Sequence, residues 1–82
     1  MKVLKTWDEV REVCEDLCKN RKRWAKKYYK DAYNRTFLYS KGLKDMLWDS
    51  VKAIEKLENY LQRHGYMLDK TALIEEMNSS IK

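Results

Sequence analysis

Cysteine and histidine are the residue types in this chain that most often bind metals or take part in catalysis. Cys14 and Cys18 are four residues apart, and His64 is the only histidine. A zinc site needs four ligands, so a second subunit or carboxylates would have to complete one here. We therefore expect two buried thiols that behave as small apolar side chains, with no metal or other cofactor.

His64 lies directly before Gly65, at the expected C-terminal end of a helix. The negative end of the helix dipole favours an imidazolium at this position, which indicates a capping role. The sequence contains no glycine-rich phosphate loop, no nucleophile elbow and no clustered carboxylate motif. We therefore expect no catalytic residues and a protein that is not an enzyme.

Positive charge is concentrated in the middle of the chain. The 82 residues carry 18 basic and 13 acidic side chains, for a net charge of +5. Residues 19–44 hold ten of the basic side chains and a single acidic one, Asp31. On a regular helix, an arc of roughly 140° contains six of these cations: Lys19, Lys22, Arg23, Lys26, Lys27 and Lys30. Tyr29 and Tyr33 flank this arc.

Such an arc is under repulsive strain, because like charges four residues apart destabilise a helix by about 0.2–0.5 kcal/mol per pair. The repulsion is offset where the arc meets a polyanion or an acidic protein surface. In the first case the cations would contact phosphates and the tyrosines would stack on bases. The alternative that needs no ligand is a solvated helix face, with lysines that extend their charges into water and tyrosines that pack on a neighbouring element.

Arg21, Arg35 and Trp48 depart from the polar and apolar pattern of their segments. The two arginines face the apolar side of the first helix. An ion pair across the helices, with Glu58 as the candidate acid, would satisfy one of them, and a bound phosphate or carboxylate is the other option. Trp48 lies on the polar side of the second helix, where a tryptophan often anchors an interface. We predict partner contacts at all three residues.

The elements that position these residues are predicted to be helices. The chain has no proline, and only Gly42 and Gly65 interrupt it. Apolar residues recur at helical spacing, and Thr6 and Asp69 are suitable N-caps. We predict one all-α domain over residues 1–82, with helices over approximately 6–40, 43–64 and 70–80.

The first two helices would form a hairpin, to which the short third helix is added. The first helix is longer than the second, so its N-terminal part needs cover for Trp7 and its neighbours. Either the chain bends near Lys19–Asn20, or a second copy supplies the cover, and we favour a homo-oligomer. No apolar stretch has the length of a membrane span. Two cysteines without a disulfide framework indicate the reducing cytoplasm.

These features predict a small cytoplasmic binding protein. Its basic, tyrosine-flanked helix face would bind nucleic acid or a phosphate-bearing ligand. The alternative is a protein–protein interaction module, an inhibitor or adaptor that docks on a larger protein and occludes it. The separation of charge along the chain favours this alternative. A small viral or plasmid-borne regulator would have this size.

Overall fold

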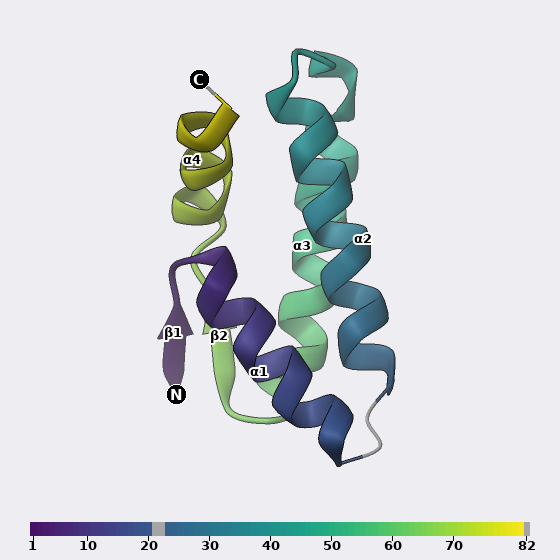
Figure 1. The fold of residues 1–82 in the computed structure, drawn as a ribbon, viewed down its shortest axis with the longest axis vertical. Coiled ribbons are helices and arrows are strands. Elements are labelled where there is room, and N and C mark those ends of the chain that lie inside the picture. The colour runs from purple at the N-terminus through teal and green to yellow at the C-terminus, as the bar shows by residue number, and fades with distance from the viewer. Residues whose placement is uncertain (21–22, 82) are drawn as a thin grey trace.

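The computed structural model describes residues 1–20 and 23–81, apart from the side chains of Lys44, Ser80 and Ile81. The chain is mostly helical, as predicted, and it also contains a short strand pair that was not predicted (Figure 1). In chain order the elements are β1 (Lys2–Leu4), α1 (Trp7–Lys19), α2 (Arg23–Ser40), a 3₁₀ turn (Lys44–Met46), α3 (Leu47–Gln62), β2 (Tyr66–Leu68) and α4 (Lys70–Ile81). None of the described helices is both long and apolar enough to cross a bilayer.

Over residues 6–40, where the sequence predicts one long helix that is either continuous or bent near Lys19–Asn20, the structure has two helices, α1 and α2. α1 ends at Lys19, and the backbone N–H of Asn20 donates to the carbonyl of Leu17, 3.1 Å away. Asparagine ends helices readily, since its side chain competes for backbone hydrogen bonds. α2 begins at Arg23 and packs against α1. The chain therefore changes direction close to the bend expected near Lys19–Asn20 (Figure 1).

α2 and α3 run side by side in opposite directions and share the most extensive contact in the molecule (Figure 1). Gly42 turns the chain between them with a φ of 101°, a left-handed conformation that glycine adopts without strain. α3 starts later than predicted, at Leu47, because residues 44–46 form the 3₁₀ turn. The small residues Ala25 and Ala32 are fully buried, and they let α2 approach its neighbours closely.

The two strands lie side by side although 61 residues lie between the end of β1 and the start of β2. Lys2 pairs with Tyr66 and Leu4 with Leu68 in a parallel ladder. Gly65, with a φ of 87°, reverses the chain between α3 and β2. Leu4 and Leu68 are buried, so both strands contribute a side chain to the core.

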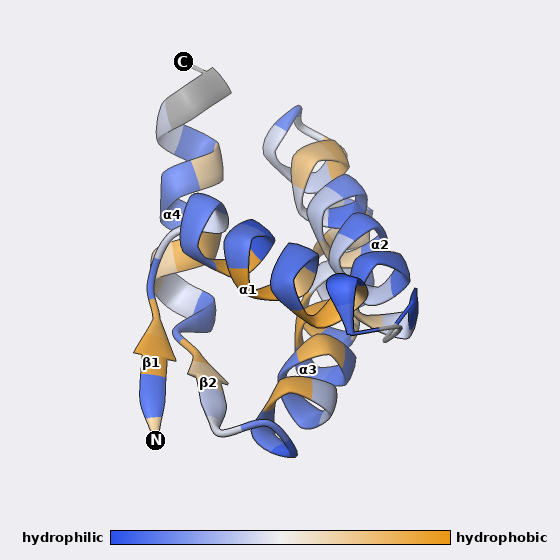
Figure 2. Cartoon of the chain, turned by 60° about the horizontal axis from the view of Figure 1, so that its bottom comes forward, coloured by the Kyte–Doolittle hydropathy of each residue, from blue (hydrophilic) through white to orange (hydrophobic). Residues whose placement is uncertain are grey.

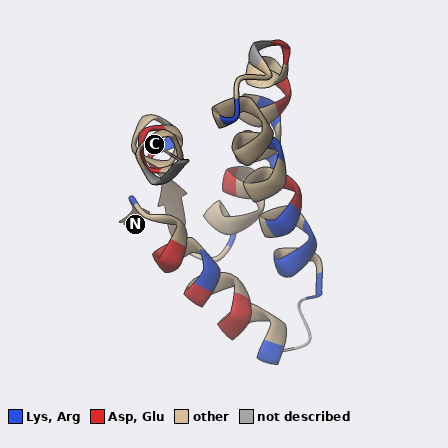
Figure 3. Cartoon of the chain, turned by 45° about the horizontal axis from the view of Figure 1, so that its top comes forward, with Lys and Arg blue, Asp and Glu red and all other residues tan. Residues whose placement is uncertain are grey.

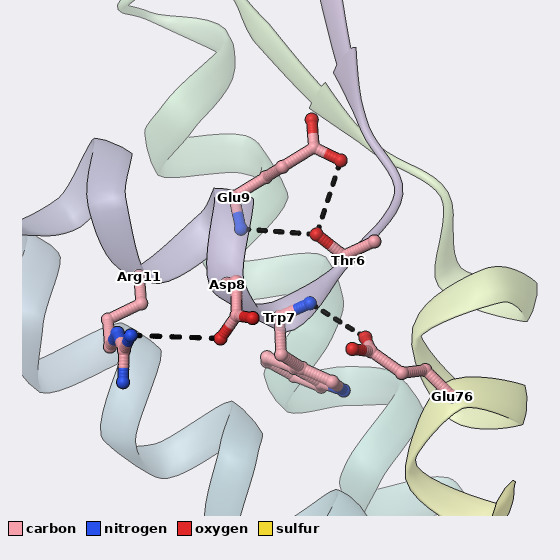
Figure 4. Close-up of polar contacts among 6 residues, drawn as sticks. All are labelled: Thr6, Trp7, Asp8, Glu9, Arg11 and Glu76. Atoms are coloured by element: carbon pink, nitrogen blue, oxygen red, sulfur yellow. Dashed lines mark hydrogen bonds and ion pairs between the residues drawn. The ribbon is translucent and has the colours of Figure 1, made fainter.

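Trp7 attaches α1 to α4. Its side chain is only 4% exposed, and its indole Nε1–H donates to the carbonyl of Leu73, 2.9 Å away. Its backbone N–H donates to a carboxylate oxygen of Glu76, 2.7 Å away (Figure 4). Thr6 caps α1, as predicted, by accepting from the backbone N–H of Glu9. The chain thus covers the N-terminal part of α1 itself, and the argument for a covering second copy no longer applies.

The core is a single cluster to which all four helices and both strands contribute. Figure 2 shows apolar bands on the inward sides of α1 and α3. The largest fully buried apolar side chains of the core are Leu4, Val10, Ile54, Leu57, Leu61 and Leu73. The predicted N-cap of α4 is also present, because the Asp69 carboxylate accepts from the backbone N–H of Ala72 at 3.1 Å.

Candidate nucleic-acid interface

The first two turns of α2 carry four exposed cations and no acidic residue. They follow one another at helical spacing on the outer side of the helix: Arg23, Lys26, Lys27 and Lys30. Ala25 and Ala32 occupy the opposite, buried side of α2. Figure 3 shows blue segments along these turns and red segments along α1, the helix that packs against α2. We call these four residues the basic arc.

The basic arc keeps its charge available for a ligand. Among the described residues, none of its four side chains lies within 4.0 Å of a carboxylate oxygen. The Nζ of Lys27 lies 4.7 Å from the centre of the Trp24 ring. This cation–π contact orients Lys27 without neutralising it.

Two of the six cations predicted to share one arc are not part of it. Lys19 is the last residue of α1, and its Nζ lies 3.8 Å from a carboxylate oxygen of Asp16. Lys22 lies outside the described residues. The arc is smaller than predicted because α1 ends before it and the two helices run in different directions (Figure 1).

Tyr29 and Tyr33, the two tyrosines predicted to flank the arc, both contact Trp7. Both rings are half-buried and make edge-on contacts with Trp7, at centroid distances of 6.1 Å and 5.4 Å. Burial, and to a smaller extent the neighbouring Tyr33, raises the pKa of Tyr29 above its usual value. The two tyrosines therefore belong to the contact between α1, α2 and α4, where they also line an open cavity beside Trp7.

A different set of aromatic residues lies next to the basic arc. The rings of Trp24 and Tyr28 on α2 are 6.1 Å apart, and Tyr28 lies 5.4 Å from Tyr60 on α3. His64 follows, with its ring 5.3 Å from that of Tyr60. The sequence places Tyr28 and Tyr60 on separate helices, so only the packing of α2 against α3 brings them together.

Tyr28 and Tyr60 line an open groove between α2 and α3. The groove has a volume of about 300 Å³, and its other lining residues are Lys56, Asn59 and Arg63. No acidic residue lines it. Burial is the main cause that raises the pKa of Tyr60, and Arg63 opposes the shift. We call this cavity the aromatic groove; it combines two rings, two cations and one amide.

Arg35 is engaged by carboxylates of the chain itself. Its Nε donates to Asp31 at 2.9 Å, and a terminal nitrogen lies 3.6 Å from Asp49 on α3. The hydrogen bond to Asp31 is the main cause that raises the pKa of Arg35. The ion pair across the helices is therefore present, with Asp49 as the acid. Arg21 lies outside the described residues.

The predicted acid for that ion pair, Glu58, has other partners. It accepts a hydrogen bond from the backbone N–H of Leu68 at 3.1 Å and pairs with Lys70 at 3.8 Å. This correction follows from β2, because the strand occupies the side of α3 on which Glu58 lies.

Trp48 is 73% exposed at the beginning of α3, on the side predicted for it. Three further apolar side chains in or beside the turn between α2 and α3 are also exposed: Leu38, Leu43 and Leu47. We call these four residues the tip patch. It lies at the opposite end of α2 from the basic arc (Figure 1).

Cys14 is a buried residue of α1. Burial, with smaller contributions from Cys18 and Glu15, raises the pKa of the Cys14 thiol to about 12. Cys14 is therefore a protonated thiol at neutral pH and a poor nucleophile. Within the described part of the chain, no three Cys, His, Asp or Glu side chains gather as a metal site would require. His64 follows α3, and its backbone N–H donates to the carbonyl of Leu61 at 2.9 Å.

Comparison with known proteins finds no matching family model, curated protein or solved structure. The residues of the chain itself must therefore support any functional inference. They provide two surfaces of distinct chemistry, a basic and aromatic one and an apolar one.

Proposed function

We propose that this chain is a small non-enzymatic binding protein whose basic arc contacts the phosphates of nucleic acid or of another phosphate-bearing ligand. The observation that supports the proposal is the cluster of four cations on two turns of α2, which have no carboxylate partner within 4.0 Å in the part of the chain that the structure describes. Lys56 and Arg63 extend the positive surface from α2 to α3. Binding would relieve the repulsion within the cluster and release counterions from the phosphates.

A pair of triple variants tests this proposal. Lys26, Lys27 and Lys30, each replaced by Glu, should weaken oligonucleotide binding at least about tenfold at low salt. Replacing Lys2, Lys5 and Lys41 by Glu changes the net charge equally but leaves the basic arc intact, so this control should bind nearly as well as the wild type. Fluorescence anisotropy with a labelled oligonucleotide measures both affinities. Equal losses in the two variants would overturn the proposal, because net charge alone would then explain binding.

A second candidate function is protein–protein interaction through the tip patch. Its support is the exposure of Trp48 and of three leucines around one turn, since exposed tryptophans frequently dominate binding energy at interfaces. In this case the chain would be an inhibitor or adaptor, and the tip patch would contact a larger protein partner. The patch could instead contact a second copy of the chain in a homo-oligomer. The absence of a disulfide between Cys14 and Cys18 suits action in the cytoplasm.

A further inference from the structure

We infer that the aromatic groove accepts an unpaired nucleobase, so that the preferred ligand of this protein is single-stranded nucleic acid. This inference rests on the proposed function, because it extends the phosphate contacts of the basic arc to the bases. The inference adds the aromatic groove between α2 and α3 to the binding surface, and the phosphate contacts proposed for the basic arc stay the same.

Rings in the groove and beside it are available for stacking. Trp24, whose ring lies beside that of Tyr28, is 58% exposed. Tyr28 and Tyr60 are half-buried and line the groove from two helices. A flat base can stack on such rings whatever its sequence, because every base has a π face. In a duplex those faces are covered by neighbouring base pairs, so an unpaired base is the matching ligand.

The size and the polar groups of the groove also suit one base. Its volume of about 300 Å³ is at the lower end of the range of roughly 300–1,000 Å³ for small-molecule sites. The Asn59 amide can both donate to and accept from the edge of a base. Lys56 and Arg63 supply positive charge for the adjoining phosphates, and the lining contains no carboxylate that would repel them.

The Trp24 ring connects the basic arc to the aromatic groove. Lys27 belongs to the arc, and its Nζ lies over the Trp24 ring. The Trp24 ring in turn lies beside Tyr28 at the groove. A strand whose phosphates follow α2 could therefore place a base on these rings without leaving the protein surface.

The test compares Trp24→Leu with Trp48→Leu, since both replace an exposed tryptophan. Binding is measured to oligothymidine DNA, to oligouridine RNA and to a DNA duplex of the same length, with heparin as a polyanion that has no bases. Tyr60→Leu is a second variant, and it replaces a ring that lines the groove itself. Circular dichroism and urea unfolding verify that each variant is folded before its affinity is compared.

We expect the wild type to prefer at least one of the two single strands to the duplex. Trp24→Leu should lower that affinity about tenfold and leave retention on heparin unchanged, while Trp48→Leu changes neither. If Trp24→Leu and Tyr60→Leu both bind the single strands as the wild type does, the inference is wrong, although the proposed function stands. If the wild type binds neither nucleic acid nor heparin, both are wrong.

Discussion

A single residue, Trp7, connects α1 to both α2 and α4. It follows the N-cap of α1, contacts Tyr29 and Tyr33 on α2, and donates two hydrogen bonds to α4. Because its backbone N–H is one of those that a helix leaves unpaired at its start, the Glu76 carboxylate both accepts from it and faces the positive helix end. The consequence is that Tyr29 and Tyr33 contribute to the packing of α1 against α2 and α4.

The buried thiol of Cys14 predicts a pH dependence of stability. Below pH 9.0, the ordinary pKa of a thiol, Cys14 is protonated in both the folded and the unfolded chain. Above it the unfolded chain loses this proton first, because the folded pKa is about 12. The unfolded state then binds fewer protons, so the free energy of unfolding should fall as the pH rises from 9.0 towards about 12.

Urea unfolding over this pH range, in the wild type and in Cys14→Ala, measures the effect. Tyrosines and lysines titrate in both proteins, so the difference between the two curves isolates Cys14. The wild type should lose more free energy of unfolding than the variant as the pH rises. Parallel curves would contradict the proposed burial of the thiol.

At the scale of the elements, Glu58 connects α3 to β2. Its side chain is 13% exposed and accepts from the backbone N–H of Leu68, whereas that of Glu55 is 50% exposed. Both carboxylates pair with Lys70, so they differ mainly in the bond to the strand. Glu58→Ala leaves a partly buried backbone donor without its acceptor, which should lower the free energy of unfolding by about 1–3 kcal/mol.

Glu55→Ala is the matched control and should cost less than about 1 kcal/mol, as exposed ion pairs do. Urea unfolding measures both values, and hydrogen exchange reports on the Leu68 amide directly. That amide should exchange faster in Glu58→Ala than in Glu55→Ala. Equal exchange in the two variants would show that Glu58 does not hold β2.

The sequence predicts the helices better than it predicts their arrangement. The apolar spacing of α3 and the positive φ of Gly42 and Gly65 follow from local rules. The sequence does not by itself fix a helix end after Lys19, because neither glycine nor proline occurs there. The two strands have three residues each, which is too short to establish an alternating pattern, and their parallel pairing depends on tertiary packing.

The same limit applies to the candidate interface. The four cations of the basic arc follow helical spacing within one helix, so a helical wheel finds them. The contact between Tyr28 and Tyr60 crosses two helices, and no spacing along the chain indicates it. Tyr29 and Tyr33 are close to the cations along the chain, whereas their contacts with Trp7 depend on tertiary packing.

At the scale of the whole molecule, the basic arc and the tip patch lie at opposite ends of α2, about 27 Å long at 1.5 Å per residue. Distant surfaces without shared contacts behave additively, so each should bind without affecting the other. Trp48→Ser should abolish self-association or partner binding through the tip patch and leave oligonucleotide affinity unchanged. The triple Glu variant of Lys26, Lys27 and Lys30 should do the reverse.

A protein that carries both Trp48→Ser and the triple Glu change should lose both kinds of binding. The loss of free energy of binding at each surface should equal the loss in the corresponding separate variant. Light scattering over a range of protein concentrations measures self-association, and anisotropy measures oligonucleotide affinity in the same samples. A loss of oligonucleotide affinity in Trp48→Ser alone would contradict independence, because the tip patch would then contribute to the nucleic-acid complex, for instance by pairing two copies whose basic arcs bind one strand.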